Sequence, residues 1–246
     1  MQVAVNLKIL KSSGTYLKRK AYQYLVLWIS CLIVFGVMFL TLDPLLPLYI
    51  DLGRYNPPRT VAMILPLIGM LAFYRRHRDY KRGFEGENQV TRVLSSALSD
   101  DYVLINDVQL DVSKRSNIDH IVLGPTGIFV LETKNHGGKI LCYEDSWTGM
   151  GPNPFVQARV NASRVYKVIE ASGIFVSDLP WIQAVAVFAN TKAELEIRRA
   201  PSNVEVLKID DLRNYITQET RRLSAQEIEL VSKEILNVHA NVRGRI

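Results

Sequence analysis

Two carboxylates and an amine that could act together lie in one short segment, residues 117–134. A Gly-Pro-Thr-Gly sequence at 124–127 is typical of a turn and the runs on either side are apolar, so the segment predicts a β-hairpin. If its loop has two or four residues, Asp119 lies directly opposite Glu132, with about 4.5 to 5.5 Å between their Cβ atoms. Lys134 is two residues past Glu132 and shares its face. A three-residue loop would turn the two carboxylates to opposite faces.

Opposed carboxylates of this kind are suited to sharing one cation. Two ionised carboxylates about 5 Å apart repel by roughly 3 kcal/mol at an effective dielectric of 20, and a purely structural hairpin would avoid that cost. The structural alternative is a surface ion pair of Glu132 with Lys134 on an edge strand, with Asp119 solvated or capping its strand. The residues alone leave both interpretations open.

An ordered set of landmarks surrounds these residues and resembles a known family. The landmarks are Gly83-x-x-Gly86-Glu87, Asp119, Glu132-Thr133-Lys134 and Asn153-Pro154-x-x-Gln157, with Trp147 and Asn161 nearby. Together they resemble the nuclease-related domain (NERD), whose core is similar to that of the PD-(D/E)XK nuclease superfamily. The resemblance covers residues 83–189 and leaves out the N-terminal third of the chain and the last two predicted helices.

This resemblance implies a metal-dependent phosphodiesterase site. Asp119 and Glu132 would bind Mg²⁺ or Mn²⁺ through carboxylate oxygens and leave the other positions to water and phosphate. Lys134 would orient or help deprotonate the attacking water and offset charge on the phosphorus. Glu87 would be a further metal ligand or base. The alternative for Glu87 is ordinary stabilisation of a helix N-terminus.

A polar stripe on the helix predicted after Asn153-Pro154 supplies the remaining candidates. Gln157, Asn161 and Arg164 fall at i, i+4 and i+7 and therefore on one helix face. The resemblance implies that Gln157 is a fourth catalytic residue, whose amide bonds phosphate or water. We expect Arg164, Asn161 and Lys139 to contact nucleic acid. The alternative is that the stripe is only the solvated side of the helix.

Two histidines lie close to the hairpin residues. His120 points to the opposite face from Asp119, so we do not expect it to bind a metal. His136 follows Lys134 in a glycine-rich bend and could touch a ligand, but we favour a solvated loop position for it.

These residues must be positioned by helices and strands, and the order of the predicted elements indicates an α/β fold. We expect a central mixed β-sheet flanked by helices, as in a restriction-endonuclease-like core. Amphipathic periodicity predicts helices over 85–98 and 154–172, and two more near 211–221 and 225–239. Short β-branched runs predict strands over 102–105, 118–123, 128–134, 139–143, 181–188 and 204–207. We expect a membrane anchor over 1–82, a nuclease-like domain over 83–190, and a C-terminal α/β extension over 191–246.

The charge of the chain is unevenly distributed. The 246 residues carry a formal charge of +6, which alone would suggest nucleic-acid binding. Residues 1–82, however, carry +9 and the remainder carries −3. The basic excess therefore belongs to the N-terminal third, and net charge does not identify a partner for the rest.

Two uncharged apolar runs within that third predict transmembrane segments over about residues 24–42 and 60–74, forming an α-helical hairpin. Five basic residues precede the first run, five follow the second and two lie between them. The positive-inside rule therefore places both termini and the soluble domain in the cytoplasm, at a bacterial-type inner membrane. Because the second run has 14 residues and contains Pro66, one span plus an interfacial helix is the alternative. A cleaved signal peptide fits poorly, because the first run is too long and no small-residue cleavage site follows it.

We therefore expect a membrane-anchored, cytoplasm-facing protein that hydrolyses phosphodiester bonds of nucleic acid with Mg²⁺ or Mn²⁺. We expect nucleic acid and the lipid bilayer as partners, and we favour DNA over RNA. The sequence leaves open whether the protein forms a homo-oligomer. The alternative is a non-catalytic, membrane-tethered module that binds nucleic acid or protein with a retained nuclease fold. No Lys/Arg-dense stretch in the soluble part predicts strong sequence-independent DNA affinity.

Overall fold

A computed structural model of the chain describes residues 7–11, 14–41, 57–111, 117–149, 151–174, 182–218 and 223–244. The chain divides into two compact units. One, the helical unit, is Tyr16–Phe84, and the other, the α/β unit, combines Met1–Thr15 with Glu85–Ile246. The α/β unit contains the predicted hairpin and is therefore the unit that holds the candidate site.

The helical unit consists of helix α1 (Thr15–Thr41) and most of helix α2 (Pro57–Ala97). Aromatic pairs join the two helices, with Tyr24 stacked on Tyr80 at 5.5 Å between ring centroids and Trp28 packed on Tyr74 at 5.9 Å. The two helices are therefore packed together through side chains that are large and mostly apolar.

One stretch of the described residues, Thr15–Phe39 in α1, is long and apolar enough to cross a membrane. Its apolar side chains are exposed, as at Ile33 and Phe39. The second predicted span lies in α2, and among the described residues this helix has no stretch that is long and apolar enough to qualify as well. The structure thus supports one of the two predicted spans. The segment that connects the two predicted spans falls mostly on residues 42–56, which are not among the described residues.

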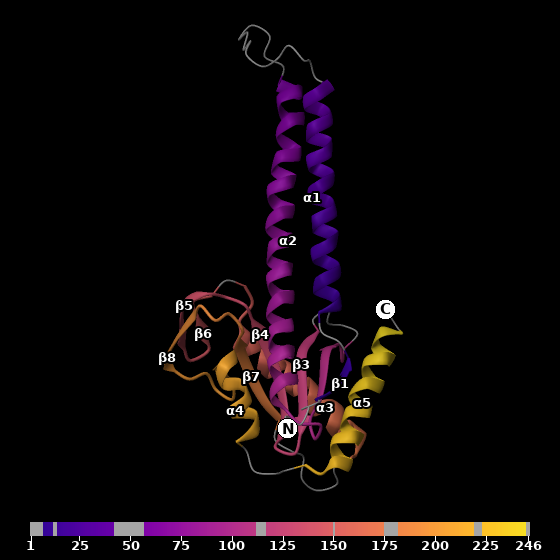
Figure 1. Ribbon diagram of the computed structural model, residues 1–246, viewed down its shortest axis with the longest axis vertical. Coiled ribbons are helices and arrows are strands. Elements are labelled where there is room, and N and C mark those ends of the chain that lie inside the picture. The colour runs from indigo at the N-terminus through magenta and orange to yellow at the C-terminus, as the bar shows by residue number, and fades with distance from the viewer. Residues whose placement is uncertain are drawn as a thin grey trace, which may run out of the picture. The chain divides into compact units, whose positions relative to one another are not determined.

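A mixed six-stranded sheet, counted over the described residues, forms the centre of the α/β unit (Figure 1). Its strand order is β1-β2-β3-β4-β7-β9, with antiparallel pairing of β2 with β3 and β3 with β4 and parallel pairing elsewhere. This confirms the predicted central mixed sheet. The strands are β1 (Lys8–Lys11), β2 (Val103–Val108), β3 (Ile118–Gly124), β4 (Gly127–Lys134), β7 (Ile182–Phe188) and β9 (Glu205–Lys208).

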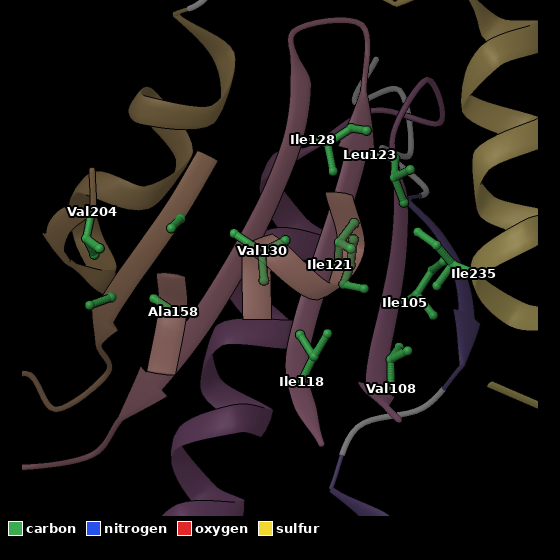
Figure 2. Packing of buried hydrophobic residues seen from close by; sticks show 14 of the residues in the cluster. Ile105, Val108, Ile118, Ile121, Leu123, Ile128, Val130, Ala158, Val204 and Ile235 are labelled. Carbon is green, nitrogen blue, oxygen red and sulfur yellow. The ribbon is translucent and has the colours of Figure 1, made fainter. Parts of the chain in front are cut away.

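Helices cover both faces of this sheet, because its strands alternate apolar side chains toward each face. One face packs against α3 (Pro154–Ser172) and α5 (Ala225–Arg243), through residues that include Ile105, Ile121 and Val130 (Figure 2). The other face packs against the last turns of α2 and against α4 (Leu212–Thr217), which follows a 3₁₀ turn at Ile209–Asp211. The candidate site lies on the α3 face.

A second sheet is built from β5 (Gly138–Tyr143), β6 (Ser146–Trp147) and β8 (Ala193–Arg199), in the order β6-β5-β8. We did not predict β6, β8 or β1. β6 has two residues, and β8 is rich in charged residues, so neither stands out as a buried strand. β1 is a four-residue strand that pairs with β2, although its residues fall in the region predicted as anchor.

Helix α2 differs most from its prediction. We expected a helix beginning near residue 85, but α2 runs without a break from Pro57 to Ala97. The residues before Glu85 are apolar or basic and carry no strong helix-stop signal, so the helix continues through them. Trp181, predicted to begin β7, lies outside the described residues, as does the end of the helix predicted to reach residue 221.

Candidate functional site

The hairpin of β3 and β4 has a two-residue loop, Pro125-Thr126, between the paired residues Gly124 and Gly127. Glycine is required at 124, because a Cβ there would lie 2.0 Å from the ring of Tyr102. The last described pair is His120 with Leu131, so the next step along the ladder sets Asp119 opposite Glu132. This is the register that the symmetric-loop prediction requires.

Asp119, Glu132 and Lys134 meet at the end of the hairpin away from its loop. Lys134 Nζ lies 2.9 Å from Glu132 Oε1, and both side chains are largely buried. The backbone N–H of Thr133 donates to Asp119 Oδ2 at 2.7 Å. Glu132 is therefore not part of a surface ion pair on an edge strand, because β4 lies between β3 and β7.

Helix α3 places the predicted polar stripe against Glu132 and Lys134. Asn153 caps the helix by accepting from the N–H groups of Phe155 and Val156, and Pro154 occupies the first turn. Gln157 follows one turn later, and its Oε1 accepts from Lys134 Nζ at 2.8 Å. The Asn-Pro-x-x-Gln spacing thus starts the helix at the position that sets Gln157 against Lys134.

The rest of the stripe lies behind Glu132. Asn161 Nδ2 donates to Glu132 Oε2 at 3.3 Å, and Arg164 Nη1 donates to Asn161 Oδ1 at 3.1 Å. Asn161 is buried at 4% exposure, so its position suits holding Glu132 and not the direct contact with nucleic acid that we expected. The stripe is not a solvated helix face, because the sheet covers it.

Glu87 reaches the same region from helix α2. A Cβ at the neighbouring Gly86 would lie 2.8 Å from Asn135 Cβ, so glycine allows the helix to approach the end of β4 closely. Glu87 is buried, whereas Glu85 is exposed. Because Glu87 lies well inside a 41-residue helix, stabilisation of a helix N-terminus does not explain it.

Burial perturbs all three carboxyl groups, and the charges of neighbouring carboxylates add to its effect on Glu87 and Asp119. Burial, then the charges of Asp107 and Glu132, raise the pKa of Glu87 to about 8. Burial, then the charges of Glu132 and Glu87, raise the pKa of Asp119 well above its usual range. Burial also raises the pKa of Glu132, although the neighbouring Lys134 lowers it. A buried group of carboxylates with this repulsion is favourable only when protonated or when a cation is bound nearby.

The donor set fits a hard divalent cation held by two carboxylates. Across the described part of the chain, no three His, Cys, Asp or Glu side chains converge closely enough to hold a metal ion between them. Mg²⁺ typically binds through one or two carboxylates and keeps water and phosphate as its other ligands. Asp119 and Glu132 meet that requirement, and Glu87 lies near them as a further charge.

Three other residues lie apart from this arrangement. Lys139 is on β5 in the second sheet, where it forms an exposed ion pair with Glu196 at 2.8 Å. His120 is fully buried and bonds Asn106 Oδ1 at 2.7 Å, and burial lowers its pKa to about 3, so it is neutral. His136 packs edge-to-face on Trp147 at 5.3 Å, so it is not a fully solvated loop residue.

Sequence reasoning missed Asp107. This residue follows a buried run of β2, is 5% exposed and has a left-handed backbone with φ of 55°. Its charge reaches Glu87, as the pKa of Glu87 indicates. A polar Asn-Asp pair at the end of an apolar strand was the available signal, but nothing in the local sequence connects it with the hairpin.

Part of the chain matches a known family. Residues 82–189 match the nuclease-related domain family (NERD). The match includes the hairpin, the start of α3 and the Gly86-Glu87 turn of α2, and it supports a nuclease-like fold. β1, β8, β9, α4 and α5 lie outside the nuclease-related domain, although they belong to the same α/β unit.

Two individual proteins are similar to the chain. An uncharacterized protein of Bacillus anthracis is 27% identical over 198 residues, which span 76% of this chain and 86% of that protein. The structure of Pyrococcus furiosus SfsA in complex with Ca²⁺ is 13% identical with a TM-score of 0.25, over 64% of this chain and 53% of that chain. This chain therefore spans about half the length of the SfsA chain.

Proposed function

We propose that the protein is a membrane-anchored, metal-dependent nuclease that hydrolyses phosphodiester bonds of nucleic acid. The observation that carries this proposal is the contact of Lys134 with both Glu132 and Gln157, next to Asp119, inside a nuclease-related domain. Two carboxylates for a cation, an amine and an amide on one face are the groups that phosphodiester hydrolysis requires.

Asp119 and Glu132 would hold Mg²⁺ or Mn²⁺, which when bound would polarise the phosphate and lower the pKa of a water. The Lys134 ammonium would orient that water and offset charge on the phosphate. Gln157 fixes the Lys134 ammonium and keeps its own amide N–H₂ for phosphate or water. Asn161 donates to the second oxygen of Glu132, and Arg164 in turn donates to Asn161, which keeps that carboxylate in a single orientation.

The predicted membrane anchor indicates where in the cell this activity would be located. Helix α1 would cross the bilayer. Helix α2 would cross it a second time, which gives the transmembrane hairpin that the sequence predicts, or would lie at its interface. The soluble domain would have the PD-(D/E)XK-like core. The basic residues that flank both helices favour the cytoplasmic side of a bacterial inner membrane for both termini and the α/β unit. DNA is the favoured substrate over RNA, and self-association is compatible with an anchored protein.

The test is cleavage of linear, circular and single-stranded DNA and of RNA by the full chain in detergent, with Mg²⁺, with Mn²⁺ and with chelator. We expect cleavage that requires the metal and falls at least about 100-fold in Lys134→Ala and in Glu132→Ala, because each variant removes a charged group at the reacting centre. Lys139→Ala is the matched control, since Lys139 pairs with Glu196 away from the site. Activity that survives both site substitutions would refute the assignment.

The alternative function, a non-catalytic module that tethers nucleic acid or protein, is separated by the same variants. A module of that kind would bind its partner equally well with Asp119→Asn and without a divalent cation. Loss of cation binding in Asp119→Asn, measured by calorimetry with Mn²⁺, supports the nuclease.

A further inference from the structure

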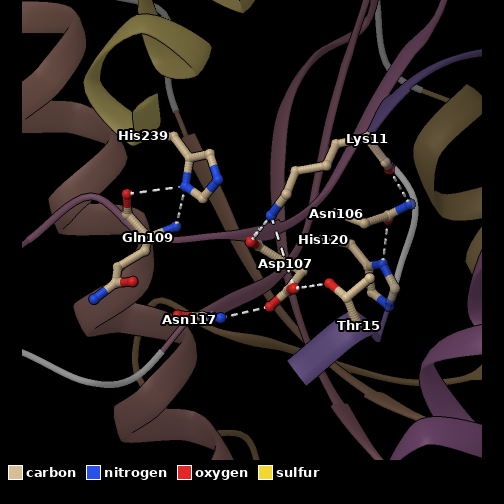
Figure 3. Close-up of polar contacts among 8 residues, drawn as sticks. All are labelled: Lys11, Thr15, Asn106, Asp107, Gln109, Asn117, His120 and His239. Carbon is tan, nitrogen blue, oxygen red and sulfur yellow. Dashed lines mark hydrogen bonds and ion pairs between the residues drawn. The ribbon is translucent and has the colours of Figure 1, made fainter. Parts of the chain in front are cut away.

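A second group of polar residues surrounds Asp107 (Figure 3). Thr15 Oγ1 donates to Asp107 Oδ2 at 2.8 Å, and Asn117 Nδ2 donates to Asp107 Oδ1. Lys11 Nζ lies 3.8 Å from Oδ2 and also donates to the Asp107 backbone carbonyl. Both carboxylate oxygens of Asp107 therefore have partners, and one partner is a cation.

The sheet register sets Asp107 in line with the proposed metal ligands. Asn106 pairs with His120 and Val108 with Ile118, which leaves Asp107 beside Asp119 across β2 and β3. Asp119 in turn lies opposite Glu132. The backbone positions of three acidic residues thus align across three adjacent strands. Lys11 contacts Asp107 at one side of this row and Lys134 contacts Glu132 at the other.

Lys11 is held in place by its backbone as well as by its side chain. It ends β1, where it pairs with Ile105, and its carbonyl accepts from Asn106 Nδ2 at 2.9 Å. The Lys11 side chain is 18% exposed and that of Asp107 is 6% exposed. An ion pair this sheltered from water exerts a stronger effect on its neighbours than a surface pair does.

We propose that Lys11 is a positioning residue of the metal site: by keeping Asp107 ion-paired, it leaves the divalent cation to Asp119 and Glu132. This inference rests on the proposed function. An unpaired Asp107 would add an uncompensated negative charge near the cation. Lys11 thus limits how tightly the cation is bound, and it comes from the segment that precedes α1.

The experiment is an Mn²⁺ titration of the full chain in detergent, followed by electron paramagnetic resonance. We expect Lys11→Met to bind Mn²⁺ about threefold or more tighter than the unaltered chain, because a positive charge near the cation is removed. A residue with only a structural role would have the opposite effect, since its loss would disorder the site and weaken binding. Adding Asp107→Asn to Lys11→Met should return the affinity to its original value.

Lys8→Met is the matched control, because Lys8 is exposed on the same strand. Lys11→Arg should bind Mn²⁺ as the unaltered chain does, and Lys11→Gln provides an uncharged variant that can still donate to the carbonyl if Lys11→Met does not fold. Unchanged or weaker Mn²⁺ binding in a folded, uncharged Lys11 variant overturns this inference alone. An unaltered chain that binds no Mn²⁺ overturns the proposed function as well.

Discussion

Each oxygen of Glu132 has a different partner, and this defines the site at the scale of single residues. Lys134 bonds Oε1 and Asn161 bonds Oε2, so the carboxylate has little freedom to rotate. The buried amide and ammonium partners also explain how a carboxylate with little access to water is tolerated within the sheet.

Glu87 gives the protein a measurable dependence on pH. Its folded-state pKa of about 8 lies above the ordinary value of 4.5, so the folded protein holds a proton that the unfolded chain has released between these two values. Stability without metal should consequently fall as the pH rises from about 4.5 to about 8. Thermal unfolding of the metal-free full chain across this range measures the slope, and Glu87→Gln should reduce it.

Glu85→Gln is the control for this prediction, because Glu85 is exposed two residues away on the same helix. Its pH dependence should match that of the unaltered chain. Added Mg²⁺ should oppose the loss of stability at high pH, since the cation neutralises the ionised carboxylates. Equal slopes in Glu85→Gln and Glu87→Gln would contradict the role given to burial of Glu87.

At the scale of elements, the site depends on two helices that approach the end of β4 from opposite faces of the sheet. Helix α3 is fixed by its Asn153 cap and its apolar face, and helix α2 is fixed by the packing of Val90, Leu94 and Leu98. The carboxylates, Lys134 and Gln157 therefore converge from four separate segments. A small shift of either helix would separate side chains whose contacts span only about 3 Å.

Gly86→Ala tests this dependence on close approach. Alanine favours a helix by about 1 kcal/mol over glycine, but the added Cβ meets the Asn135 Cβ at 2.8 Å. Because that atom is close to the backbone of the strand end, we expect a net destabilisation of about 1 to 2 kcal/mol and lower activity. Ser96→Ala on an exposed position of the same helix should cause neither change, and a Gly86→Ala protein as stable as Ser96→Ala would disprove the packing argument.

At the scale of the whole molecule, the α/β unit is assembled from both sides of the helical unit in the sequence. β1 precedes α1, and the other strands of the central sheet follow α2. β1 covers the edge of β2 and supplies Lys11 next to Asp107, so the chain before the apolar helix is part of the candidate site. The helical unit is thus inserted between two parts of one sheet, and cutting the chain after it removes β1 from that sheet.

A fragment that begins at Gly83 should consequently be impaired. It lacks β1, which leaves the edge of β2 open to pairing with other molecules and Asp107 without Lys11 and Thr15. We expect thermal unfolding about 5 °C or more below that of a chain in which a Gly/Ser linker joins residues 1–15 to 85–246, together with self-association in size-exclusion chromatography. Equal thermal stability of a monomeric fragment would show that β1 is dispensable.

The sequence alone determined the features that depend on local chemistry. The hairpin and helix α3 follow from a Gly-Pro-Thr-Gly turn, alternating apolar residues and an Asn-Pro helix start, all of which act over a few residues. The register of the hairpin depended on its loop length, which the structure shows to be two residues. The polar stripe of α3 was also visible, but the sequence left open whether it faces water or the sheet. That choice required the position of β4 beneath the helix.

Only the tertiary structure decided the features that join distant segments. Lys11 and Asp107 are 96 residues apart, and the short strand β1 carries too weak a local signal to indicate its pairing with β2. Glu87 was recognisable as a candidate, but its pKa is raised first by burial and then by the charges of Asp107 and Glu132, which lie on other elements. Long-range pairing and burial decide these properties because both depend on which surfaces the folded chain brings together.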